Sequence, residues 1–310
     1  MSASSPSGRS TSAVFEASEA TNSGSFGSLE WLLFLSVSAI WGSSFLLIAE
    51  GLEALTPGLV TLGRVGMGAM ALGLLRLLRP ADVTPIAPED RRTVFLLSVL
   101  WVALPFTLFP LSQQWITSAL AGLLNGATPI FAAVVSAVLV KTRPNSNQLI
   151  GIAVGFVGVI LISLPSLGEG GSEARGVLMV VAATLCYGFA INMASPLQAR
   201  YGATTLMSAV LGLATVWTIP FGLWNFGDNE WQLQPIIAVA FLGAVGTGGA
   251  YWIMATLVGR IGPIRGSFIT YLIPVVALAL GVTFRNDEVA LLAVVGAVVT
   301  ISGALMASRR

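Results

Sequence analysis

The sequence predicts an all-α membrane protein whose ten transmembrane helices form two inverted five-helix repeats. Three observations support this fold class: 55% of the 310 residues are hydrophobic and only 9% are charged, several long stretches carry no charge, and the chain resembles itself at an offset of about 145 residues. A soluble domain usually needs about a quarter of its residues charged to cover its surface, so the composition excludes one.

The positions of the charges divide the chain into spans. A helix crosses a hydrocarbon layer of about 30 Å in about 20 apolar residues, with every backbone group bonded internally. The charge-free stretch 93–140 holds 48 residues, enough for two spans with a polar break at 112–118, and region 56–78 is a span with one internal charge, Arg64. The expected helices are 29–50, 56–78, 92–112, 117–140, 146–165, 176–199, 203–226, 235–258, 262–283 and 288–308.

The expected domains are an N-terminal repeat at 29–165, a C-terminal repeat at 176–308 and a disordered tail at 1–28, which has almost no bulky apolar side chains. With the N-terminus inside, twelve Lys and Arg residues fall in inner segments and only Arg175 and Arg285 in outer ones. Short cytoplasmic loops collect basic residues. We therefore expect a multi-pass protein of the cytoplasmic membrane with both termini in the cytoplasm.

Missing residue types exclude whole classes of chemistry. The chain has no histidine and one cysteine, Cys186, which excludes imidazole metal sites, Ser-His and Cys-His catalytic groups and disulfide frameworks. Its only lysine, Lys141, lacks the frame of a Walker A loop, and a net charge of +1 offers no face for nucleic acid. We expect no enzyme, no cofactor and no metal, and a monomer whose partners are a small-molecule substrate and the lipid bilayer.

Internal similarity indicates how the spans are organised. An offset of 145 residues superposes Pro129 on Pro274, Gly151 on Gly296 and Gly158 on Gly303, and an offset of 146 places Trp41 on Tyr187. Because each half holds an odd number of helices, the second half must enter the membrane from the opposite side. Inverted repeats of this kind allow alternating access around a central site, which favours a transporter.

Four short motifs, in order along residues 30–308, resemble the EamA-type drug/metabolite transporters. They are Trp41-Gly42-Ser43-Ser44-Phe45, Arg64, Thr128-Pro129-Ile130-Phe131 and Ile273-Pro274. The resemblance implies a ten-helix, two-repeat secondary carrier, often an exporter of amino acids or related small metabolites. Many members carry Gly-Glu-Arg after the fourth and ninth helices, where this chain has Val140-Lys141-Thr142-Arg143 and Arg285-Asn286-Asp287-Glu288.

Arg64 is the clearest functional candidate, because a charge within a span is costly unless it is paired or lines a cavity. One alternative is structural: Arg64 pairs with Glu50 or Glu53 near the outer boundary, or extends its side chain toward the outer interface. The other is functional: its guanidinium borders a central cavity, where it holds a substrate carboxylate or closes an outer gate with Glu50.

Aromatic and small polar side chains near mid-span complete the predicted site, although each could instead fill space or form an interhelical hydrogen bond of about 0.6 kcal/mol. The expected substrate-binding residues are Trp41, Ser44, Arg64, Trp101, Asn125, Thr128, Tyr187, Asn192, Tyr251, Trp252, Thr270 and Tyr271, and the expected gating residues are Glu50, Pro129 and Pro274.

The predicted function is a secondary transporter that exports small amphipathic metabolites, amino acids or their derivatives, by alternating access. Since Glu50 is the carboxylate nearest to a span interior, we expect downhill efflux or exchange rather than a proton-driven cycle. A channel, or a lipid-handling or scaffold membrane protein, is the alternative.

Overall fold

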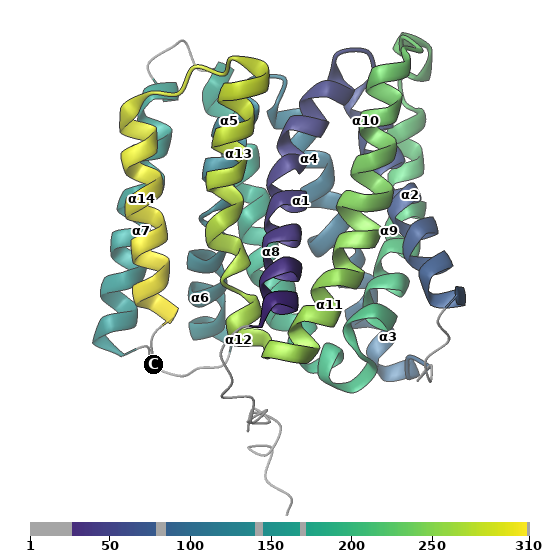
Figure 1. Cartoon of the computed structure of the whole chain (residues 1–310), viewed down its shortest axis with the longest axis horizontal. Coiled ribbons are helices and arrows are strands. Elements are labelled where there is room, and N and C mark those ends of the chain that lie inside the picture. The colour runs from purple at the N-terminus through teal and green to yellow at the C-terminus, as the bar shows by residue number, and fades with distance from the viewer. Residues whose placement is uncertain (1–26, 79–84, 140–144, 168–171, 309–310) are drawn as a thin grey trace, which may run out of the picture.

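The computed structural model describes residues 27–78, 85–139, 145–167 and 172–308, which are almost entirely helical (Figure 1). No strand occurs within these ranges, and the predicted all-α fold class is confirmed. The tail expected at 1–28 lies outside the described residues except for its last two positions, and the segment Val140 to Arg143 lies outside them as well.

The first repeat contains five spans, two of them built from several segments. Its first two helices are α1 (Ser28–Leu52) and α2 (Pro57–Leu78), and its fifth is α7 (Ser146–Leu167). The third span runs through η2 (Pro88–Asp90), α3 (Arg91–Leu97), η3 (Ser98–Ala103) and α4 (Leu104–Ser112). The fourth span, expected to be continuous, is divided into α5 (Ser118–Asn125) and α6 (Thr128–Leu139). Pro129 lies in the first turn of α6, where proline is tolerated because its missing N–H has no helical partner.

The second repeat follows the same order. It contains α8 (Ser172–Tyr201), α9 (Ala203–Leu223), η4 (Phe226–Asp228), α10 (Leu233–Gly243), η5 (Ala244–Gly249), α11 (Ala250–Ile261), α12 (Pro263–Gly266), α13 (Ile269–Arg285) and α14 (Leu291–Ser308). The ninth span was expected from residue 262, but Gly262 ends α11 with a positive φ of 82° and α12 forms a separate short turn before α13 begins. A positive φ favours glycine, which has no Cβ to clash.

The number of spans agrees with the prediction. Within the described ranges, nine continuous helical stretches are long and apolar enough to cross a membrane, and α13, with 17 residues, is a shorter apolar tenth. The start of α1 and the end of α14 lie at the same end of the bundle, as an even number of crossings requires (Figure 1). We call this end the proximal face and the opposite end, where α1 joins α2 and α13 joins α14, the distal face.

Matching irregularities show that the two repeats are related. The third and eighth spans each contain a π-helical segment, η3 and η5, and these segments begin and end 146 residues apart. Packing is matched as well: α1 packs on α13 as α8 packs on α6, and α2 packs on α10 and η5 as α9 packs on α3 and η3. The inverted repeat is therefore present both in local geometry and in tertiary contacts.

Helices α7 and α14 meet along a seam of five glycines, Gly151, Gly155, Gly158, Gly296 and Gly303. A Cβ built on Gly151 would lie 2.7 Å from the carbonyl oxygen of Gly303, and one on Gly158 would lie 2.7 Å from that of Gly296. These two contacts exchange with each other under the 145-residue offset. The structure shows backbone packed against backbone along this seam, as small residues at a helix interface allow.

Candidate substrate site

Arg64 is buried between the second, third and eighth spans. Its side chain projects from α2 and the residue is only 7% exposed. The guanidinium carbon Cζ lies 3.6 Å from the ring centroid of Phe106, and Nε donates a hydrogen bond to Oγ1 of Thr247 over 3.3 Å. The Thr247 hydroxyl in turn donates to the carbonyl oxygen of Leu242 over 3.1 Å. A desolvated cation over an aromatic face gains about 2 kcal/mol, which offsets part of the cost of burying the charge.

Four aromatic side chains from both repeats gather around this arginine. Tyr251 of α11 makes edge-to-face contacts with Trp41 of α1 and with Trp101 of η3, at centroid distances of 5.8 and 6.2 Å. Tyr187 of α8 stacks at a tilt on Phe109, 6.1 Å away. Trp101, Tyr187 and Tyr251 pack on the hydrophobic cluster that contains Phe106, the ring in contact with Arg64. The structure therefore brings together five of the predicted site residues.

We call Arg64, Phe106, Thr247 and these four aromatic residues the central cluster. The arginine and its two direct partners are buried, whereas the four aromatic residues are partly exposed. The rings thus keep surface with which a ligand can make contact. A cationic group enclosed by apolar rings is suited to a solute that has one anionic group and an apolar body.

The predicted amide and hydroxyl candidates are differently placed. Asn192 donates from Nδ2 to the carbonyl oxygens of Ala132 and Gly188, at 2.9 and 2.8 Å, and so joins α8 to α6. Ser44 donates to Ile40 within its own helix, although it lies beside Gly246 of η5, next in sequence to Thr247. Asn192 therefore fastens two helices, while Ser44 borders the central cluster.

Several other candidates bond or pack locally. Thr128 donates to the backbone carbonyl oxygen of Asn125, itself half-buried, and Thr270 donates to that of Ser267. Tyr271 lies against Phe268, with centroids 6.0 Å apart. None of these contacts involves Arg64. Their place in a substrate site stays a prediction.

The last aromatic candidate and the predicted gating prolines have clear neighbours. Trp252 packs, partly buried, on the hydrophobic cluster formed by α2, the third span, α8 and α9. The ring of Pro274 lies against Gly126, 2.9 Å from a Cβ built there. Gly126 marks the break between α5 and α6, and Pro129 lies in the first turn after it, so Pro274 of the ninth span packs against the break in the fourth span.

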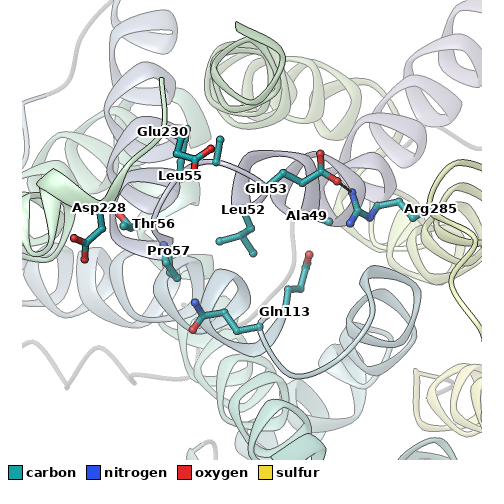
Figure 2. A pocket seen from close by; sticks show the side chains of 12 residues that line it. Ala49, Leu52, Glu53, Leu55, Thr56, Pro57, Gln113, Asp228, Glu230 and Arg285 are labelled. Carbon is teal, nitrogen blue, oxygen red and sulfur yellow. Dashed lines mark hydrogen bonds and ion pairs between the residues drawn. The ribbon is translucent and has the colours of Figure 1, made fainter. Parts of the chain in front are cut away.

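Glu50 lies at the distal face and not beside Arg64. Arg285, at the end of α13, donates from Nη1 to Glu50 over 3.0 Å and to Glu53 over 2.5 Å, as Figure 2 shows for Glu53. Gln234 donates a further hydrogen bond to Glu50 over 2.8 Å. The structure thus differs from the alternative in which Arg64 pairs with Glu50 or Glu53. We call Arg285, Glu50 and Glu53 the distal clamp.

Three residues that sequence analysis missed are central to these arrangements. Phe106 gives no sequence signal beyond its apolar character. Thr247 does give one: the 146-residue offset that superposes Trp41 on Tyr187 also superposes Trp101 on Thr247. Arg285 was assigned only to an outer loop, because its partners lie more than 230 residues away in the chain.

Known proteins show which family shares this architecture. The model of the EamA-like transporter family matches residues 28–164 and again residues 174–309. The chain belongs to the EamA-like transporter family. It is therefore a multi-pass membrane protein of a transporter family, and the family match falls once on each five-helix half.

Individual relatives of the family are similar over most of their length. The "Uncharacterized transporter YdfC" of Bacillus subtilis is 26% identical over 270 residues, covering 85% of this chain and 86% of the relative. The "Probable amino-acid metabolite efflux pump" of Escherichia coli is 24% identical over 282 residues, covering 88% and 92%. A solved crystal structure with 17% identity matches at a TM-score of 0.60 over 90% of this chain and 96% of that chain, which shows the same fold.

Proposed function

We propose that the chain is a secondary transporter of the cytoplasmic membrane that exports small amphipathic metabolites, amino acids or their derivatives, by alternating access. The observation that carries this proposal is the buried guanidinium of Arg64 among aromatic side chains from both repeats. Membership of the EamA-like transporter family and the efflux pumps named among the relatives also support export of metabolites.

Arg64 supplies the recognition chemistry. Among the described residues no carboxylate forms an ion pair with it, and its known contacts use Nε and the face of the guanidinium. The two Nη groups form the planar fork that binds a carboxylate through two parallel hydrogen bonds. The rings of Trp41 and Tyr251 then contact the apolar part of the substrate.

The inverted repeats supply the transport cycle. Side chains of the central cluster come from α1, α2 and the third span of one repeat and from α8, η5 and α11 of the other. Relative movement of the two repeats therefore displaces the cluster residues of one repeat against those of the other, as alternating access requires. We place both termini in the cytoplasm and treat residues 29–165 and 176–308 as the two moving units of a monomer.

Counterflow in reconstituted vesicles tests the function. Vesicles loaded with one unlabelled amino acid should accumulate the labelled compound with saturation, whereas a channel or scaffold would show no counterflow. Arg64→Ala should abolish counterflow of carboxylate-bearing substrates, and Arg64→Lys should restore part of it. Arg260→Ala, which removes an ion pair with Glu30 at the proximal face, is the matched control. Unchanged transport in Arg64→Ala would refute the role of Arg64.

We infer that transport is downhill efflux or exchange, because the central cluster contains no carboxylate among its members. Glu50 is the group that a proton-driven cycle would use, and it lies in the distal clamp. A Glu50→Gln variant should keep its downhill flux. Loss of pH-gradient-driven accumulation in that variant, with downhill flux retained, would contradict the inference.

A further inference from the structure

Two cavities open beside the distal clamp. The first, of about 460 Å³, lies between the loop from α1 to α2, the end of α4 and the loop from α9 to α10 (Figure 2). The second, of about 670 Å³, lies between the α4–α5 turn, the end of α7 and the α13–α14 turn. Both are lined by Ala49, Gln113 and Arg285, so these three residues separate one cavity from the other.

The walls of both cavities are acidic. The first is lined by Glu53, Asp228 and Glu230, and the second by Glu173, Asp287 and Glu288. Arg285 is the one basic residue among the described residues that line either cavity. This guanidinium is already bonded to Glu50 and Glu53. The distal face therefore holds a cation-binding pair of carboxylates that is occupied by a side chain of the protein itself.

The loop between α9 and α10, which carries Asp228 and Glu230, is hydrogen-bonded in place beside the first cavity. The backbone N–H of Thr56 donates to Oδ1 of Asn229 over 2.7 Å, and the backbone N–H of Glu230 donates to the carbonyl oxygen of Ala54 over 2.8 Å. These two bonds fasten the loop between α9 and α10 to the loop between α1 and α2. Asp228 and Glu230 are thereby fixed on the side of the cavity opposite Arg285 (Figure 2).

Gln113 marks the junction of the cavities. Both polar atoms of its side-chain amide are buried, and neither has a hydrogen-bond partner among the described residues. A buried amide without partners costs about 1–3 kcal/mol, so this group is suited to bonding a ligand. Arg285 and Gln113 both line each of the two cavities. Displacement of the arginine therefore removes part of the cavity wall beside the Gln113 amide.

We propose that the two cavities form a second ligand site, for small solutes with a primary ammonium group, in which the ammonium replaces the Arg285 guanidinium at Glu50 and Glu53. A primary ammonium offers three N–H donors on a compact centre, enough to bond both carboxylates. The Gln113 amide then bonds a polar group elsewhere on the ligand. Binding at this site is independent of the central cluster and of whether the chain transports.

Comparison of the two repeats indicates that the carboxylate pair of Glu50 and Glu53 occurs at the distal face alone. At the 146-residue offset, Glu50 and Glu53 fall on Pro196 and Ala199 of α8, neither of which can bind a cation through its side chain. The repeat mate of the carboxylate pair therefore cannot form a clamp at the proximal face. The two carboxylates are an addition to the shared architecture and not a requirement of it.

Equilibrium binding of radiolabelled ethanolamine to the purified full chain in nanodiscs tests the proposal. In Arg285→Ala the competing cation is absent, so binding should tighten by about fivefold or more, whereas Glu50→Gln combined with Glu53→Gln should weaken it by about tenfold. If the distal clamp only holds the helices together, both variants should bind ethanolamine more weakly than the unaltered chain. That result would overturn the proposal. Arg260→Ala should bind ethanolamine as the unaltered chain does.

A second measurement needs no variant of the clamp. Choline has the same hydroxyethyl group but no N–H donors, and it should bind the unaltered protein at least about tenfold more weakly than ethanolamine. Equal binding of the two compounds would overturn the proposal. Arg64→Ala should leave ethanolamine binding unchanged. Absence of counterflow in the unaltered protein, with ethanolamine binding intact, would therefore contradict only the transport function, and counterflow without ethanolamine binding would contradict only this second site.

Discussion

Replacing Phe106 by leucine should expose how the charge of Arg64 is tolerated inside the bundle. The ring of Phe106 lies 3.6 Å from Cζ of Arg64, and the two residues are 3% and 7% exposed. A cation–π contact contributes about 0.5–1 kcal/mol at a surface and about 2 kcal/mol when desolvated. The near-complete burial places this pair at the upper value. Since leucine also repacks imperfectly at a cost of about 1 kcal/mol, Phe106→Leu should destabilise the protein by about 3 kcal/mol.

A double-mutant cycle separates these two contributions. In an Arg64→Met background, Phe106→Leu should cost only the packing part, about 1 kcal/mol, which leaves a coupling energy of about 2 kcal/mol. The measurement is unfolding in mixed detergent micelles, followed by tryptophan fluorescence. Phe109→Leu is the matched control, because Phe109 is equally buried but packs on Phe45 and Tyr187. A coupling below about 0.5 kcal/mol would refute the cation–π account.

Three further changes test other contacts by the same unfolding assay. Thr247→Val keeps the side-chain volume but removes the hydrogen bond to Arg64, and should cost about 1.5 kcal/mol because that bond is long; no loss would show that the bond is unimportant. Gly151→Ala places a methyl group 2.3 Å from a backbone nitrogen of α14 and should cost about 1–3 kcal/mol; equal or greater stability would show that the seam can open. Asp287 accepts hydrogen bonds from the Ser118 hydroxyl and the Ala119 backbone N–H and so caps the start of α5. Asp287→Asn weakens this acceptor and should cost about 1 kcal/mol; unchanged stability would contradict the capping role.

Span number and repeat relationship could be predicted because both rest on one-dimensional patterns. Charge-free stretches fix where a helix can cross a membrane, and an offset comparison detects the duplication whatever the tertiary contacts are. The break between α5 and α6 and the late start of α13 were missed, because they depend on packing. Pro274 against Gly126, for example, is a contact that no local pattern contains.

The candidate site was predictable only where a residue type is informative by itself. Arg64, Trp41, Trp101, Tyr187 and Tyr251 stood out as polar or amphipathic groups within apolar spans, and they converge. The pairing of charges was not predictable. Glu50 is close to Arg64 in sequence, yet it bonds Arg285 from the far end of the chain. The alternative that paired Arg64 with Glu50 rested on this short separation and is wrong.

The glycine seam between α7 and α14 has a mechanical consequence. With backbone atoms in direct contact at both Gly151 and Gly158, no side chain larger than a hydrogen atom fits between the two helices at either position. A larger residue at either glycine would therefore push α7 and α14 apart. The last helices of the two repeats are thus held together as one close-packed pair along this edge of the molecule.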